Sequence, residues 1–201
     1  MREGDLSLGP ATATARLVLL HGWGADADDL LDLGEMLAGE SVQVLALQAP
    51  QPHPGGFGRQ WYDLQTPNWP GLGAARLDLR QRLEELASQV PLTRTVLLGF
   101  SQGAAMALDA AGDLPLAGLV ACSGYPHPDW EPRTPQAPIL LTHGEQDPVV
   151  PYAASEEILK RWLTAGGSGE LLGFLGGHTI DETVLPPLRQ FVQERLRGLT
   201  G

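Results

Sequence analysis

The chain has 201 residues, 43% of them hydrophobic, and we expect one domain spanning residues 1–201 with a well-buried core. A formal net charge of -11 repels nucleic-acid phosphates and anionic lipid headgroups, so no nucleic-acid partner and no stable membrane association are expected. The single cysteine excludes an intrachain disulfide.

The N-terminal stretch is polar, and the first apolar run, "LVLL" at 17–20, is far shorter than a signal or membrane segment. The cytoplasm is therefore the expected location. Six short apolar runs follow one another along the chain and are predicted to be strands: 16–20, 42–47, 94–100, 116–122, 137–143 and 170–176. They are continuously apolar, which is typical of strands buried on both faces of a parallel sheet.

Apolar residues at three- and four-residue steps predict amphipathic helices between the strands. The stripes are Leu72, Ala75, Leu79, Leu83, Leu86 and Val90; then Ala154, Ile158, Trp162 and Ala165; then Val184, Leu188, Phe191 or Val192, and Leu196. Alternating strands and helices predict a doubly wound α/β sheet, in which ligands bind beyond the carboxyl ends of the strands. Cys122 lies inside an apolar run and is expected to be a buried core thiol.

The stretch 50–71, rich in Pro, Gly and aromatic residues, shows no regular period. Loops of this length in compact domains are usually functional, often as a lid or a pocket wall. We expect the aromatic side chains of Phe57, Trp61, Tyr62 and Trp69 to line an apolar slot for the substrate. The alternative is a loop held down by its own aromatic residues.

The segment "GFSQG" at 99–103 follows a predicted strand and precedes a predicted helix. A G-x-S-x-G pattern in that setting is typical of the nucleophile elbow, where the serine sits in a strained turn and the glycines let neighbouring backbone pass. Ser101 is thus the candidate nucleophile. A tight turn that needs glycine only for packing is the alternative interpretation.

A serine hydroxyl needs a base, and the base needs an orienting carboxylate. On a sheet that carries a nucleophile elbow, these groups follow in the order Ser, Asp or Glu, His. His178 is the one histidine beyond the strand-end acids, and Asp147 follows a predicted strand. Glu145 and Asp181 remain rival acids.

Two backbone N–H groups are candidates for an oxyanion hole: that of Gln102, which follows the nucleophile, and that of Trp23 in the glycine-rich turn after the first strand. His21 and His143 end strands before a glycine and are expected to bond loop backbone. The chain has no His-x-x-x-His pattern or carboxylate cluster, so neither a metal nor a cofactor is expected.

Taken in order, "LHGWGAD", "QWYDL", "GFSQGAAMAL", "LAGLVACSGYPH", "APILLTHGEQDPVVP" and "GGHTI" resemble the phospholipase/carboxylesterase family of α/β hydrolases, the acyl-protein-thioesterase-like enzymes. The resemblance covers nearly the whole chain. It implies Ser101 as nucleophile, Asp147 as orienting acid, His178 as general acid and base, and amides of Trp23 and Gln102 for the oxyanion.

The resemblance implies a hydrolase of carboxylic esters or thioesters whose partner is a small ester or an acylated substrate. A lysophospholipase-type lipid hydrolase is the alternative within this class, and a catalytically silent binding module is the alternative outside it. The family's acidic "D-E-x-G-I"-like stretch is absent, and Ala104 stands where glycine is frequent. Because the absent stretch helps to shape the substrate region, no acyl-chain preference is carried over; the change at Ala104 is harmless on a helix.

Overall fold

A seven-stranded sheet forms the centre of the computed structural model, which describes residues 1–134 and 137–197. The strand order is β1-β3-β2-β6-β7-β8-β9, and only the edge strand β1 is antiparallel to its neighbour. The strands are β1 (Leu6–Leu8), β2 (Arg16–Leu20), β3 (Gln43–Leu47), β6 (Thr95–Phe100), β7 (Gly118–Cys122), β8 (Ile139–Gly144) and β9 (Gly169–Phe174). A separate antiparallel pair joins β4 (Gln51–Pro52) to β5 (Arg59–Gln60).

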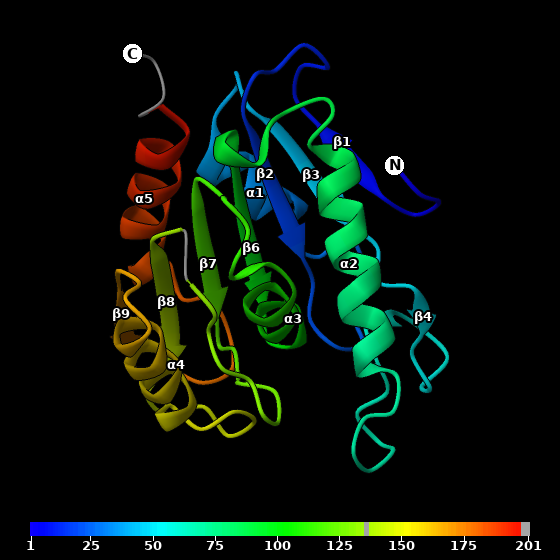
Figure 1. The fold of residues 1–201 in the computed structure, drawn as a ribbon, viewed down its shortest axis with the longest axis vertical. Coiled ribbons are helices and arrows are strands. Elements are labelled where there is room, and N and C mark those ends of the chain that lie inside the picture. Colours follow the sequence, from blue (N-terminus) through cyan, green and yellow to red (C-terminus); the bar gives the residue numbers. More distant parts are fainter. Residues whose placement is uncertain (135–136, 198–201) are drawn as a thin grey trace.

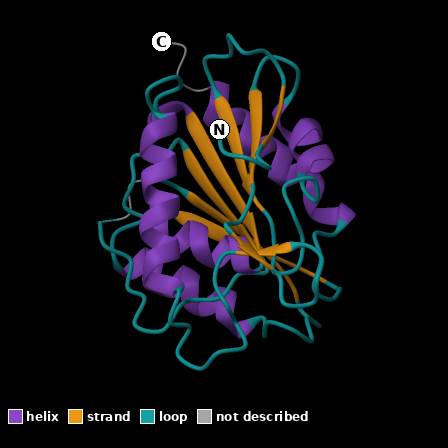
Figure 2. Cartoon of the chain, turned by 90° about the vertical axis from the view of Figure 1, so that its right-hand side faces the viewer, coloured by secondary structure: helices purple, strands orange, loops and turns teal. Residues whose placement is uncertain are grey.

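Helices cover both faces of the sheet (Figures 1 and 2). One face carries α2 (Leu72–Leu86), α3 (Gln102–Ala111) and α4 (Ala153–Thr164), and the other carries α1 (Leu31–Ala38) and α5 (Leu185–Arg197). Two 3₁₀ turns, η1 (Leu92–Arg94) and η2 (Glu182–Val184), precede β6 and α5.

The apolar runs are continuous because each strand supplies side chains to two cores. In β2, Val18 and Leu20 pack in the cluster beneath α2–α4, whereas Leu17 and Leu19 pack in the cluster beneath α1 and α5. All four side chains are at most 1% exposed. Alternation along the strand therefore divides the chain's apolar content between two layers, as expected for a doubly wound sheet.

The α/β-hydrolase fold expected from the sequence is confirmed, and each of the six predicted strands is present with its ends shifted by at most two residues. Val90 is buried but lies beyond the end of α2, and Ala165 lies one residue beyond α4. The expectation that 50–71 lacks regular structure is wrong in part, because β4 and β5 form a short hairpin there.

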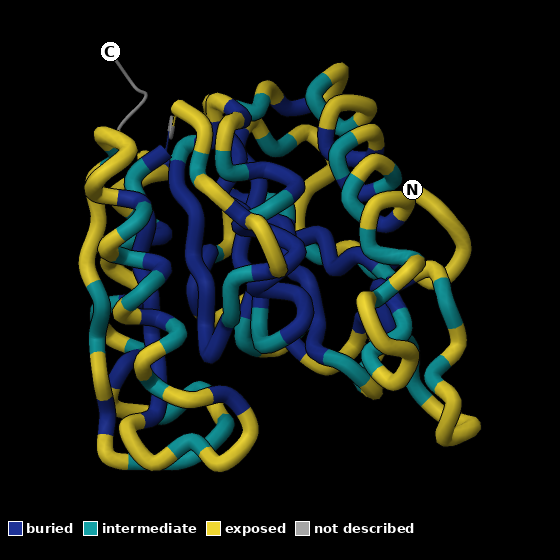
Figure 3. The backbone as a smooth tube through the Cα atoms, turned by 60° about the horizontal axis from the view of Figure 1, so that its bottom comes forward, coloured by how far each residue is buried: buried dark blue, intermediate teal, exposed yellow. Residues whose placement is uncertain are grey.

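The parallel strands all point the same way, toward the lower edge of the molecule in Figure 1. Figure 3 brings that edge forward and shows the buried strands surrounded by half-buried and exposed loops. The candidate site residues come directly after the ends of β2, β6, β8 and β9, so the topology gathers them at this edge.

Candidate active site

Ser101 occupies the turn between β6 and α3 in a strained backbone conformation, with φ 52° and ψ -116°. Both glycines of "GFSQG" are required by close backbone approaches. A Cβ on Gly99 would lie 2.3 Å from the carbonyl oxygen of Gly103, and one on Gly103 would lie 2.1 Å from that of Leu20. The two glycines therefore make room for a sharp strand-to-helix turn, and this turn exposes the serine side chain.

His178 connects Ser101 to Asp147. Its Nε2 lies 2.9 Å from Ser101 Oγ, and its Nδ1 lies 2.6 Å from Asp147 Oδ2. The His178 side chain is 17% exposed and that of Asp147 is fully buried. Three residues up to 77 positions apart in the sequence thus form one continuous hydrogen-bonded series, which is partly open to solvent at the serine.

The Asp147 carboxylate is held from several sides. Oδ1 accepts hydrogen bonds from the N–H groups of Val149 and Val150, at 2.8 and 2.9 Å. His143 Nε2 lies 3.3 Å from Oδ2. Burial favours the neutral acid, but the hydrogen bonds from His178, Val150 and Val149 outweigh it and hold the pKa of Asp147 below its ordinary value. The carboxylate is therefore charged and fixed in orientation.

Neither rival acid replaces Asp147, because both ring nitrogens of His178 are already engaged by Asp147 and Ser101. Asp181 caps the turn η2 by accepting hydrogen bonds from the N–H and hydroxyl of Thr183. Glu145 lies in the loop after β8, and the pKa of Tyr152 is raised first by burial and then by the charge of Glu145.

Gln102 directly follows Ser101 in the chain, and Trp23 lies in the loop after β2. Gln102 is the first residue of α3, so its N–H points out of the positive end of the helix. The loop after β2 also reaches the serine, since a Cβ on Gly22 would lie 3.5 Å from Ser101 Cβ. In the described part of the chain, no hydrogen-bond acceptor is found for either N–H group. Both N–H groups therefore remain candidates for binding an external oxygen.

His21 and His143 bond loop backbone, as predicted. The Nδ1 of His21 lies 2.8 Å from Gly22 O, and its Nε2 accepts from the Ala49 N–H. His143 lies between Ser155 Oγ and Val150 O. Cys122 is fully buried, and burial raises the pKa of its thiol to about 12.

The four aromatic residues of 50–71 do not gather in one open slot. Trp61 and Tyr62 are 1% and 0% exposed and belong to the core beneath α2–α4, whereas Phe57 is 82% exposed. Trp69 is half-buried and packs against Tyr62, with ring centroids 5.5 Å apart. Three of the four thus hold the segment down, as the alternative interpretation had it.

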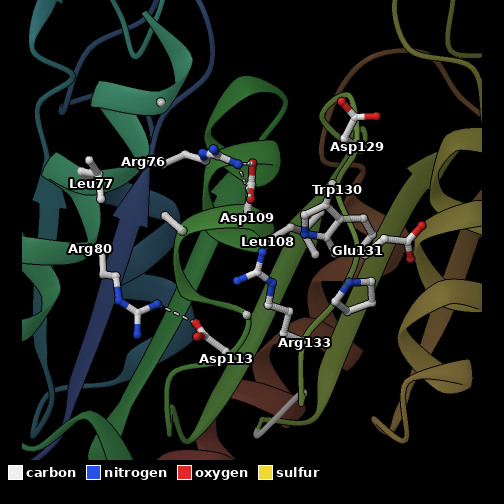
Figure 4. A pocket seen from close by; sticks show the side chains of 14 residues that line it. Arg76, Leu77, Arg80, Leu108, Asp109, Asp113, Asp129, Trp130, Glu131 and Arg133 are labelled. Carbon is white, nitrogen blue, oxygen red and sulfur yellow. Dashed lines mark hydrogen bonds and ion pairs between the residues drawn. The ribbon is translucent and has the colours of Figure 1, made fainter.

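A groove of about 430 Å³ lies apart from these residues, between α2, the second half of α3 and the segment 129–133 (Figure 4). Two ion pairs span it, Arg76–Asp109 at 3.0 Å and Arg80–Asp113 at 2.6 Å. Each of these guanidinium groups therefore already has a carboxylate partner. None of Ser101, Asp147 and His178 lines it.

Within residues 1–134 and 137–197, no group of three or more His, Cys, Asp and Glu side chains is arranged to hold a metal ion. Within these same residues, no helix is both long enough and apolar enough to cross a membrane.

A seven-stranded, mostly parallel sheet with a strained serine after a central strand, and with an acid and a histidine after later strands, defines an α/β hydrolase. Residues 8–196 match the phospholipase/carboxylesterase family, and the chain belongs to it.

Relatives and solved structures agree with this family. The chain is 33% identical to acyl-protein thioesterase 1 of Neurospora crassa over 59% of this chain and 52% of that protein. It is 28% identical to esterase YpfH of Escherichia coli over 90% of this chain and 81% of that one. The crystal structure of esterase PE8 superposes with a TM-score of 0.87 at 32% identity, covering 96% of this chain and 99% of that chain. The match to the thioesterase thus spans about half of that relative's length.

Proposed function

We propose that this protein is a serine hydrolase that cleaves carboxylic esters or thioesters through an acyl-Ser101 intermediate. The proposal rests on the hydrogen-bonded chain from Ser101 Oγ through His178 to Asp147, with the serine in a strained turn at the start of α3. The names of the similar proteins, esterase and acyl-protein thioesterase, support the same class of bond and a small ester or acylated substrate.

In the first half-reaction, Ser101 Oγ attacks the carbonyl carbon while His178 Nε2 takes its proton. Asp147 accepts the Nδ1–H of His178, which fixes the tautomer and stabilises the imidazolium that forms. The carbonyl oxygen becomes an oxyanion and receives the N–H groups of Trp23 and Gln102. Collapse of the tetrahedral intermediate expels the alcohol or thiol, which takes the proton from His178.

In the second half-reaction, His178 removes a proton from water, and the resulting hydroxide attacks the acyl-Ser101 carbonyl. The same two N–H groups receive the second oxyanion. Collapse releases the carboxylic acid and returns the proton to Ser101 Oγ. Each step uses only side chains, backbone amides and water. We propose the cytoplasm as the location, because one buried cysteine and no disulfide fit a reducing compartment.

A fluorophosphonate probe tests the proposal, because only an activated serine reacts with it. Intact mass and peptide mapping should show one adduct on Ser101 in the wild type and in Ser88→Ala, which removes an exposed serine elsewhere. Ser101→Ala should take no label, and His178→Ala should label far more slowly. A folded wild type that does not label, or that labels at another residue, contradicts the proposal.

A further inference from the structure

The segment 59–62 contacts both of the residues, or their loops, whose N–H groups are assigned to the oxyanion. On one side it meets the loop 21–25, which carries Trp23, and on the other it meets the side chain of Gln102. Neither Trp23 nor its neighbours up to Ala25 belong to a helix or strand, so the position of the Trp23 N–H depends on what holds this loop.

Four hydrogen bonds tie the segment 59–62 to the loop 21–25. Two are between backbone groups, and two come from tryptophan indoles. They are Gly24 N to Arg59 O at 2.9 Å, Arg59 N to Ala25 O at 2.7 Å, Trp23 Nε1 to Gln60 Oε1 at 2.8 Å, and Trp61 Nε1 to His21 O at 2.9 Å. The backbones approach so closely that a Cβ on Gly58 would lie 1.9 Å from Gly24 O.

The other side of the segment is held by the side chain of Gln102, which is fully buried. Its Oε1 accepts from the Trp61 N–H at 3.0 Å, and its Nε2 donates to the Tyr62 carbonyl at 2.8 Å. A primary amide of this length supplies one acceptor and one donor to consecutive backbone groups, as a neighbouring strand would. A hydrocarbon side chain supplies neither, and a carboxylate cannot donate.

The same segment is anchored further along α3. The Tyr62 hydroxyl lies 2.6 Å from that of Tyr125 and 2.9 Å from His127 Nε2. His127 Nδ1 lies in turn 2.7 Å from Asp109, which belongs to α3 as Gln102 does. The segment is thus attached to α3 at two points and to the loop of Trp23 at four.

We propose that Gln102 is a positioning residue. Its side chain holds the segment 59–62, and that segment fixes the spacing of the Trp23 and Gln102 N–H groups that receive the oxyanion. The inference rests on the proposed function. It gives one residue two separate tasks, since the backbone of Gln102 binds the oxyanion and its side chain aligns the second donor. Donors stabilise an oxyanion best when they are fixed before the reaction, so loosening this connection lowers the rate without removing a donor.

The test compares Gln102→Met, which keeps the side-chain length but makes neither hydrogen bond, with Gln60→Met, which removes the partner of the Trp23 indole. Gln190→Met on the exposed face of α5 is the matched control. Active sites are counted by fluorophosphonate titration, so a loss of folded protein does not lower kcat per site. We expect kcat per site to fall about 10- to 100-fold in both variants, with KM within about twofold and the control unchanged.

Two readouts separate positioning from a merely structural role. The inhibition constant of a trifluoromethyl ketone, whose serine adduct carries an oxyanion, should rise by the same factor as kcat/KM falls. The double variant should lose less than the product of the two single losses, because both break one connection. Should Gln102→Met prove unstable, Gln60→Met alone carries both the kcat and the inhibitor tests.

Wild-type kcat per site in folded Gln102→Met or Gln60→Met overturns the inference, and so do losses that multiply in the double variant. Neither result affects the proposed function, which Ser101→Ala tests by itself. If Ser101→Ala keeps its turnover, the proposed function fails first, and the assignment of the two N–H groups fails with it.

Discussion

The Nδ1 atom of His178 lies 2.6 Å from Oδ2 of Asp147, whose other oxygen accepts two backbone N–H groups. The N–H groups of Val149 and Val150 fix which way the carboxylate faces. The carboxylate of Asp147 therefore has one oxygen bound by its own loop and one oxygen that faces the two histidines, with His178 the nearer. These two sets of contacts determine how an asparagine amide would be oriented if it replaced the Asp147 carboxylate.

Asp147→Asn should lower kcat by about 10⁴. To keep the bonds from Val149 and Val150, the asparagine must turn its oxygen toward them and its NH₂ toward His178. A donor at that position forces the proton of the neutral imidazole onto Nε2. A protonated Nε2 cannot accept the proton of Ser101. Steady-state kinetics on a folded variant measure the loss.

Glu145→Gln is the matched control for Asp147→Asn, because Glu145 lies in the same loop and the ring nitrogens of His178 are engaged elsewhere. We expect its kcat to stay within about threefold of the wild type. A large loss in Glu145→Gln together with a small one in Asp147→Asn would mean that Glu145 is the acid.

Ser101→Ala and Ser101→Gly should both lower kcat by about 10³–10⁶, because each removes the proposed nucleophile. Their stabilities should differ. Glycine adopts φ 52° without the penalty that an alanine Cβ incurs, so Ser101→Gly should be about 1 kcal/mol more stable than Ser101→Ala. This reverses the usual ranking of alanine above glycine. Denaturant unfolding measures it, and equal stabilities would show that the turn stores no strain.

Local patterns were enough to predict the sheet and the order of its main elements. Each central strand is a continuous apolar run because it faces two cores, and that signal lies within five or six residues. The edge strand β1 gave no such signal because it has three residues with exposed or half-buried side chains. Helix α1 was missed because it is short and contains Gly34, which packs so closely that a Cβ there would lie 2.5 Å from Leu19 Cδ1.

For the candidate site, chain order placed Ser101, Asp147 and His178 after strands whose ends meet, and the structure joins them by hydrogen bonds. The arrangement of residues 50–71 could not be predicted from the sequence in the same way. Its aromatic residues suggested a slot, but Trp61 is held by the amide of Gln102, 41 positions away. Such a contact between a side chain and remote backbone leaves no periodic trace in a sequence.

The carboxylate of Asp109 should make stability depend on pH. Burial opposes its ionisation, but the hydrogen bond and charge of His127 and the pairing with Arg76 outweigh it and lower its pKa. A lowered native pKa means that the contribution is fully present above the unfolded value of about 3.9 and is lost as pH falls through the native value. Asp109→Asn should therefore cost about 1–3 kcal/mol at pH 7 and progressively less below about pH 4.

Asp113→Asn is the control for Asp109→Asn. Asp113 also pairs with an arginine of α2, but its side chain is 40% exposed, compared with 9% for Asp109. A solvated pair contributes little, so we expect a change within about 0.5 kcal/mol at pH 7. Urea unfolding of the three proteins between pH 3 and 8 measures both effects. A cost of Asp109→Asn that does not vary with pH would mean that its charge does not stabilise the fold.

Two helical glycines should respond in opposite ways to alanine. At Gly73 in α2 nothing lies within 4 Å of an added Cβ, so Gly73→Ala should stabilise the protein by about 0.5–1 kcal/mol through helix propensity. At Gly103 in α3 the Cβ would lie 2.1 Å from Leu20 O and 2.6 Å from His21 O, both backbone atoms. Gly103→Ala must therefore push the start of α3 away from β2, at a cost of about 2–4 kcal/mol.

The displacement at Gly103 would affect both N–H groups proposed to bind the oxyanion, because Gln102 precedes Gly103 and the loop of Trp23 follows Leu20 and His21. A shift of about 1 Å there is enough to misalign the donors, so kcat per titrated site should fall about 100-fold in Gly103→Ala. Gly73→Ala should keep kcat within about twofold. Thermal unfolding and single-site kinetics on both variants provide the test. A Gly103→Ala protein as stable and active as Gly73→Ala would show that the close approach of α3 to β2 is not needed for the site.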